Sequence, residues 1–143
     1  MTRRKFINFN AALLLLLLGP AVFVLALGPW IEQRFARPIK TFEVTHTTCE
    51  GGCVTVAGWL DKSGCTFVDA YAMVSAGSSY PRVATIEYRG SKLSTRFNRP
   101  TGLQAWGPWY VEASPGNTVT LYARHNCHPF WVTETKLAEV IIQ

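Results

Sequence analysis

The hydrophobic residues divide the chain into one continuous apolar run and a longer part made of short alternating segments. Residues 11–31 contain no acidic or basic side chain, and six consecutive leucines, Leu13–Leu18, lie within them. At about 1.5 Å of rise per residue, a helix of this length spans the roughly 30 Å hydrocarbon core of a bilayer. The pattern therefore predicts one transmembrane helix over residues 10–31, with the lipid bilayer as its partner.

The ends of the apolar run fit a retained anchor better than a cleaved signal peptide. Arg3–Lys5 form a basic start, Gly28-Pro29 marks the expected helix end, and Trp30 lies where interfacial aromatic residues gather. A signal peptide shares the basic start, and Val24–Ala26 offers small residues of the kind that a signal peptidase accepts. Its apolar region is usually shorter, however, at about 7–15 residues. We therefore expect a signal-anchor helix that stays attached to the protein.

From residue 41 onward, apolar and polar residues alternate in short segments separated by turn residues, as is typical of β-strands. Residues 98–107 are expected to be irregular, and residues 135–142 also fit a helix. Seven to eight short strands at this spacing predict an all-β domain, specifically an immunoglobulin-like β-sandwich. The predicted strands are 42–48, 53–60, 65–74, 83–89, 93–97, 108–113, 118–125 and 130–142.

These elements give four regions in chain order. Basic residues flank both ends of the helix, so the positive-inside rule gives only a slight preference for a cytoplasmic N-terminus. The regions are a short basic cytoplasmic N-terminus at 1–9, the helix at 10–31, a juxtamembrane linker at 32–40 and an exported β domain at 41–143.

Four cysteines decide the compartment of the β domain. An even number of cysteines in a small exported domain indicates a disulfide framework, and four cysteines allow three pairings. We favour Cys49–Cys53, across a turn formed by residues 50–52, together with Cys65–Cys127. Together with the apolar helix over residues 10–31, such disulfides predict a single-pass membrane protein with its N-terminus in the cytoplasm and its C-terminal domain in the periplasm or outside the cell.

Strand parity supports the longer of these two bridges. In a regular strand, residues two apart share a face. Cys65 then shares a face with Phe67, Tyr71 and Met73, while Cys127 shares one with residues 119, 121 and 123, which are all apolar. Both sulfur atoms are therefore expected to point toward the core.

The net charge of +5 does not indicate a nucleic-acid partner. Arg3–Lys5 supply three of these charges, and from Glu32 onward eleven basic residues nearly balance nine acidic ones. A nucleic-acid-binding protein usually shows a concentrated basic stripe, whereas the basic residues between 82 and 99 are spread out and fit a solvated face.

Metal binding is the sharpest alternative function for the domain. Thiolates and imidazoles suit zinc or copper. Disulfide formation would remove the thiols from such a site, so the thiol state separates a metal-handling accessory protein from an interaction domain with no cofactor. The candidate ligands are His46, Cys49, Cys53, His125 and His128.

The spacing Cys49-x3-Cys53 on a membrane-tethered, exported β domain resembles the dinuclear copper site of cytochrome oxidase subunit II, and more loosely the copper chaperones that serve it. The resemblance implies copper held by the two thiols. It covers these two residues alone, since the oxidase pattern has a His and a Met shortly after the second Cys, and residues 54–64 contain neither.

Catalysis is not expected from this sequence. It contains no Gly-x-Ser-x-Gly motif for a nucleophilic serine. A Cys–His pair would need a reduced thiol in an oxidising compartment, and the carboxylates show no spacing that singles out an acid–base pair.

Aromatic residues are concentrated in two short segments, 106–110 and 128–131. Because aromatic residues dominate binding hot spots, we expect a binding surface formed by Trp106, Tyr110, Phe130 and Trp131. Trp109 shares the apolar face of its strand and is expected to be buried, whereas Trp106 falls in the irregular stretch and is expected to be exposed. The sequence thus predicts a membrane-anchored, non-cytoplasmic interaction domain, as an accessory subunit or an envelope protein with a protein partner.

Overall fold

The computed structural model describes residues 3–77, 79–88 and 99–143, which fall into two compact units, Met1–Ala36 and Arg37–Gln143. The first unit contains one helix, and the second is built from β-strands. The predicted all-β character of the domain and the predicted N-terminal apolar helix are both confirmed. The predicted strand 93–97 lies outside the described residues.

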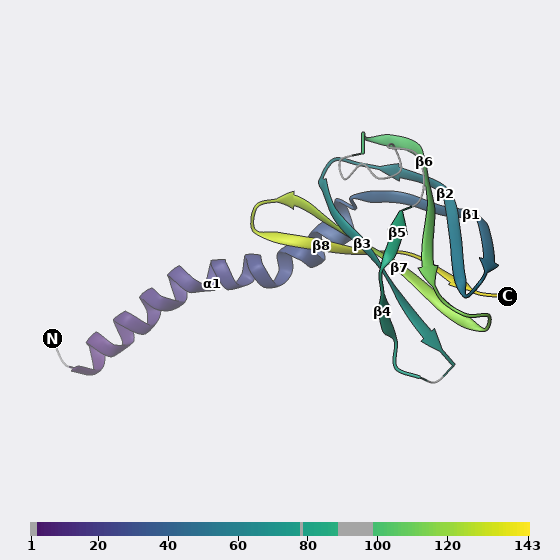
Figure 1. Ribbon diagram of the computed structural model, residues 1–143. Coiled ribbons are helices and arrows are strands. Elements are labelled where there is room, and N and C mark those ends of the chain that lie inside the picture. Colours follow the sequence, from purple (N-terminus) through teal and green to yellow (C-terminus); the bar gives the residue numbers. More distant parts are fainter. Residues whose placement is uncertain (1–2, 78, 89–98) are drawn as a thin grey trace. The chain divides into compact units, whose positions relative to one another are not determined.

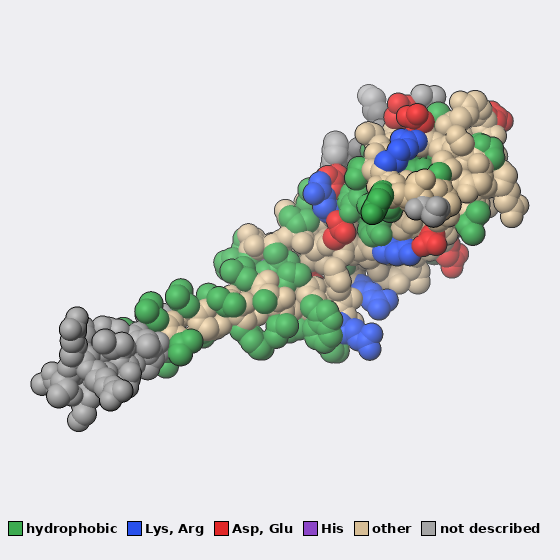
Figure 2. Space-filling view, turned by 90° about the horizontal axis from the view of Figure 1, so that it is seen from below, with side chains coloured by type: hydrophobic (Ala, Val, Ile, Leu, Met, Phe, Trp, Pro, Cys, Tyr) green, Lys and Arg blue, Asp and Glu red, His purple; other side chains and the backbone are tan. Residues whose placement is uncertain are grey.

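The helix α1 (Arg3–Phe35) is continuous and contains both Pro20 and Pro29. A proline removes one backbone hydrogen bond and bends a helix, but it does not always end it. The helix therefore runs past residue 31, where Gly28-Pro29 had indicated its end. Its segment Leu13–Phe35 is long and apolar enough to cross a membrane. Figure 2 shows hydrophobic side chains along the described part of this helix.

The described strands of the second unit form two antiparallel sheets of four strands each (Figure 1). In spatial order, the first sheet contains β1 (Ile39–Glu50), β2 (Cys53–Lys62), β6 (Gly102–Glu112) and β5 (Ile86–Tyr88). The second sheet contains β4 (Arg82–Ala84), β3 (Thr66–Ala76), β7 (Asn117–His128) and β8 (Trp131–Ile141).

One hydrophobic core joins the two sheets. Val56 and Val111 of the first sheet belong to the same buried cluster as Val119 and Leu121 of the second. Burial alternates along β7, because successive side chains of a strand point to opposite faces. Residues 135–142, which also fitted a helix, lie almost entirely in β8.

The predicted strand 83–89 is divided between the two sheets. Its first part, β4, pairs with β3, and its second part, β5, pairs with β6. Thr85 lies between the two short strands, so the chain passes from one sheet to the other at this residue. Strands that turn a corner in this way close the edge of a two-sheet domain.

The turn between β1 and β2 is one residue shorter than predicted. Glu50 pairs with Cys53, and Cys49 pairs with Val54, so that Gly51 and Gly52 alone form the turn. Both glycines have positive φ, 59° and 79°, as a two-residue hairpin turn of type I′ requires. A shift of one residue reverses the face to which each side chain of a strand points.

A bulge in β6 brings two tryptophans to the same face. Val56 of β2 pairs with Trp109, and Gly58 pairs with Trp106, which leaves Gly107 and Pro108 opposite a single residue of β2. The extra residue changes the parity of the strand, so both indoles point inward. The prediction that residues 98–107 are irregular is therefore wrong for β6, which begins at Gly102.

A second bulge lies in β3 and reverses the parity that was assigned to it. Phe67 pairs with the buried His125, and the register then shifts before Asp69 pairs with Arg124. Ala72 and Val74 are consequently buried in the core. Tyr71 and Met73, which were predicted to share the face of Cys65 and Phe67, instead lie on the outer face of the second sheet.

Candidate functional site

The outer face of the second sheet carries a cluster of aromatic and charged side chains from three neighbouring strands. The bulge in β3 turns two of its members outward, β7 supplies two more directly opposite them, and β8 supplies the last. We call this cluster the tyrosine face; it consists of Asp69, Tyr71, Tyr122, Arg124 and Glu134.

The two tyrosines form the centre of the tyrosine face. Tyr71 and Tyr122 are cross-strand partners, and their rings are stacked with centroids 5.3 Å apart and planes inclined by 13°. The guanidinium carbon of Arg124 lies 6.0 Å from the Tyr71 ring centroid, within the range of a cation–π contact. The rings and the guanidinium thus hold one another in place on the outer surface of the sheet.

Hydrogen bonds fix the polar ends of the same side chains. Arg124 donates from Nε to Asp69 Oδ1 over 2.6 Å and from a terminal nitrogen to Asp69 Oδ2, which makes the pair bidentate. The Tyr71 hydroxyl donates to Glu134 Oε2 over 2.6 Å. Because both the ring contacts and the hydrogen bonds restrict rotation, these side chains are held in fixed positions on the sheet.

The charges on the tyrosine face follow from these contacts. Partial burial and the hydrogen bond to Glu134 raise the pKa of Tyr71 to about 12, so the hydroxyl stays protonated at physiological pH. The hydrogen bonds from Arg124 lower the pKa of Asp69. The side chains of Arg124 and Asp69 remain 45% and 40% exposed, so a partner can reach the ion pair.

The predicted binding surface is not brought together by the fold. Trp106 is 2% exposed and belongs to the core, so the expectation that it is exposed is wrong. Tyr110 lies on β6 next to the buried Trp109 and Val111, and by alternation it faces the outside of the first sheet. Phe130 and Trp131 lie at the turn between β7 and β8 of the other sheet.

The turn between β7 and β8 is the more exposed of the two aromatic segments. Phe130 is 73% exposed there, and Trp131 is half-buried. His128 pairs with Trp131 across the turn, with ring centroids 3.5 Å apart, and His128 Nδ1 accepts a hydrogen bond from the backbone N–H of Phe130. The aromatic side chains are therefore held by the hairpin itself.

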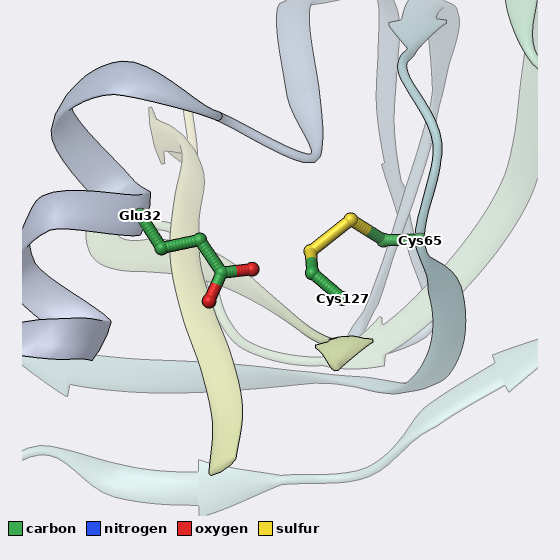
Figure 3. Close-up of side chains that lie close together, drawn as sticks. All are labelled: Glu32, Cys65 and Cys127. Atoms are coloured by element: carbon green, nitrogen blue, oxygen red, sulfur yellow. A yellow bond between two sulfur atoms is a disulfide. The ribbon is translucent and has the colours of Figure 1, made fainter. Parts of the chain in front are cut away.

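The structure contains the Cys65–Cys127 disulfide (Figure 3). Cys65 precedes β3 and Cys127 lies near the end of β7, so the bridge joins two neighbouring strands of one sheet. Both sulfur atoms are bonded to each other and cannot act as thiolate ligands of a metal.

The other two cysteines do not form the predicted bridge and are free thiols. The two-residue turn explains this, because it pairs Cys49 with Val54 and not with Cys53. Cys49 and Val54 face the core, whereas Cys53, the neighbour of Val54 in β2, points to the outer face. The same register keeps the two thiols from sharing one copper or zinc ion. Each thiol is therefore a separate, partly buried group.

The three histidines are likewise dispersed over the domain. His46 is exposed on β1, His125 is buried on β7, and His128 lies at the β7–β8 turn. Burial, together with the charge of Lys62, lowers the pKa of His125 to about 4, so this imidazole is neutral at physiological pH. Within the described ranges, no group of potential ligands combines Cys49, Cys53 and a histidine.

Comparisons with known proteins identify no relative of this chain, so its interpretation rests on its own geometry. No family model matches it, and neither a curated protein nor a solved structure gives a match.

The tyrosine face was missed by sequence reasoning because its members are far apart in the chain and a bulge changes their parity. The sequence held one weak indication. In the strand that follows Cys65, both sets of alternate residues include apolar or aromatic side chains, so either face of this strand could have been the buried one. The partner strand β7 alternates cleanly, and its polar parity contains Tyr122 and Arg124. The alternation of β7 alone would have placed Tyr122 and Arg124 on the outer face of the sheet.

Proposed function

We propose that this protein is a membrane-anchored interaction protein, with α1 as a retained anchor and an exported, immunoglobulin-like β-sandwich that binds a protein partner through the tyrosine face. The Cys65–Cys127 disulfide supports a non-cytoplasmic compartment, because structural disulfides persist in oxidising surroundings. In this role the protein is a binding module, as an accessory subunit or an envelope protein, and carries out no catalytic step.

The order of the strands supports an immunoglobulin-like arrangement. The order β1-β2-β6-β5 corresponds to strands A-B-E-D of that fold, and β4-β3-β7-β8 corresponds to C′-C-F-G. The disulfide departs from the antibody pattern, since Cys65–Cys127 joins neighbouring strands within one sheet whereas the antibody bridge joins the two sheets.

The tyrosine face is the observation that best supports the proposal of a protein partner. Tyrosine and arginine are enriched among the residues that contribute most to protein–protein binding. Tyr122 and Arg124 are placed side by side on a rigid sheet, so little conformational entropy is lost when a partner binds. Both signs of charge are present, through Arg124, Asp69 and Glu134, which suits a protein surface better than an anionic lipid surface.

Photo-crosslinking tests this surface in cells that express the chain. A photoreactive phenylalanine analogue at position 122 is expected to give a discrete protein adduct. The same analogue at position 110, which replaces a tyrosine on the outer face of the other sheet, serves as the matched control and is expected to give none. Arg124→Glu should abolish the adduct from position 122, because it reverses the charge that pairs with Asp69.

Equal adducts from positions 122 and 110, or an adduct from position 122 that survives Arg124→Glu in a folded protein, would show that the tyrosine face does not select a partner. Thermal melts of each variant establish that it is folded.

A further inference from the structure

The turn between β7 and β8 forms an uncharged, aromatic projection, which we call the hairpin tip and define as His128–Val132. From Asn126 to Thr133 the chain contains no Asp, Glu, Lys or Arg. Phe130 is 73% exposed and Val132 is 47% exposed, although both are large apolar residues. Neighbouring apolar side chains that are exposed on an uncharged turn are a candidate contact surface.

The hairpin tip lies at the end of the domain where the chain enters. Pro38, next to the first residue of β1, accepts hydrogen bonds through its carbonyl oxygen from the backbone N–H and the hydroxyl of Ser63, at 2.9 Å each. Ser63 is two residues from Cys65, which is bonded to Cys127, and Cys127 adjoins His128. This series of contacts within the β domain connects the entry point to the tip.

The covalent link to α1 limits how far this end of the domain can be from the end of the helix. Phe35 is the last residue of α1 and Ile39 is the first of β1. Four residue steps of fully extended chain span at most about 14 Å. Beyond its pairing with Thr133, the hairpin continues from His125 for three more residues, or about 10 Å at the rise of a strand. The length of hairpin beyond His125 is therefore comparable to the longest distance that the link allows between Phe35 and Ile39.

We propose that the hairpin tip inserts into the interface of the bilayer that α1 crosses and so forms a second membrane contact of the domain. This inference rests on the proposed anchoring by α1. Tryptophan and phenylalanine partition into the interfacial region, and an uncharged tip loses no charge solvation on entering it. The tether also keeps the local concentration of the tip near the membrane high, so even a weak contact is populated.

The chemistry around the tip fits a phospholipid surface. A shallow depression beside the disulfide is lined by Lys62 and Arg99, and none of the described residues that line it is acidic. Lys62 is buried and its Nζ donates to the Arg99 carbonyl oxygen, so the half-buried Arg99 is the basic side chain of this depression that can face the phosphate groups above the acyl chains. Two attachments, the helix and the tip, would fix the tilt of the domain and with it the direction in which the tyrosine face points.

Depth-dependent fluorescence quenching of the full chain tests the proposal. The protein is reconstituted into vesicles of phosphatidylcholine and phosphatidylglycerol that contain lipids with a nitroxide near the headgroup. Cys49→Ser and Cys53→Ser remove the free thiols and leave the disulfide intact. Single thiols for an environment-sensitive fluorophore are then introduced by Val132→Cys at the tip, by Tyr80→Cys, which lies beyond the far end of β3 and is 98% exposed, and by Leu25→Cys within α1.

We expect a blue-shifted, nitroxide-quenched emission at position 132 and a water-like, unquenched emission at position 80. Phe130→Asp should return the emission at position 132 to that of water, because it places a charge on the exposed tip. A water-like emission at position 132 together with quenching at position 25 would overturn the hairpin contact and leave the anchor intact. Loss of quenching at position 25 would overturn the anchor, and the hairpin contact with it.

Discussion

Replacing Trp106 by alanine is expected to destabilise the domain by about 3–5 kcal/mol, the usual cost of removing a large aromatic side chain from a core. Trp106 is 2% exposed and stacks on Phe42 with ring centroids 4.3 Å apart. It also contacts Trp109, with centroids 4.6 Å apart, and its indole N–H donates to Glu43 O over 3.2 Å. The substitution therefore removes aromatic packing from the core and leaves the Glu43 carbonyl without this donor.

Trp59→Ala is the matched control for this experiment. Trp59 lies on the neighbouring strand β2 but is 48% exposed, so its removal leaves the core intact. Chemical denaturation of both variants in detergent should give a much lower midpoint for Trp106→Ala and a midpoint near that of the parent for Trp59→Ala. Similar midpoints for the parent and Trp106→Ala would show that this side chain is not part of the core.

Loss of the Cys65–Cys127 disulfide is the second large effect that we expect. The bridge closes a loop with a sequence separation of 62 residues. In the chain-entropy description, a cross-link over a loop of this size stabilises the folded state by about 4 kcal/mol. Cys65→Ser and Cys127→Ser should each lower the free energy of unfolding by a comparable amount, as measured by urea denaturation of the oxidised protein.

The free thiol of Cys53 provides the comparison for the disulfide. It points to the outer face of the first sheet and forms no bridge, so Cys53→Ser should leave the free energy of unfolding nearly unchanged. A reducing agent should destabilise the parent and Cys53→Ser alike and have little further effect on Cys65→Ser. If all four cysteine variants lose stability equally, then the pairing seen here does not describe the oxidised protein.

Periodicity was sufficient for the parts of this fold that follow a regular repeat. The uncharged run around Leu13–Leu18 identified the helix, and alternation identified β7, whose buried residues Val119 and Leu121 have the expected spacing. The turn at Gly51-Gly52 was located from its glycines, although its length was not. Local composition thus determines where strands and turns occur.

Irregular positions were not predictable, because a bulge depends on the partner strand. The bulge at Gly107-Pro108 turns Trp106 inward, and the one before Asp69 turns Tyr71 outward. A single extra residue reverses every later assignment along a strand. The tyrosine face and the buried pair of tryptophans both result from such a shift. The proposed binding site in particular was therefore not visible from residue spacing alone.

We propose that α1 anchors the chain and that the β domain lies on the non-cytoplasmic side of the membrane. Labelling of intact cells with a membrane-impermeant maleimide tests it most directly, using single thiols in a background that carries Cys49→Ser and Cys53→Ser. Tyr80→Cys reports on the exposed surface of the β domain, and Lys5→Cys reports on the segment that precedes the apolar run. We predict labelling at position 80 before lysis and at position 5 only after lysis. Labelling at position 5 in intact cells, with position 80 protected until lysis, would contradict the proposed orientation.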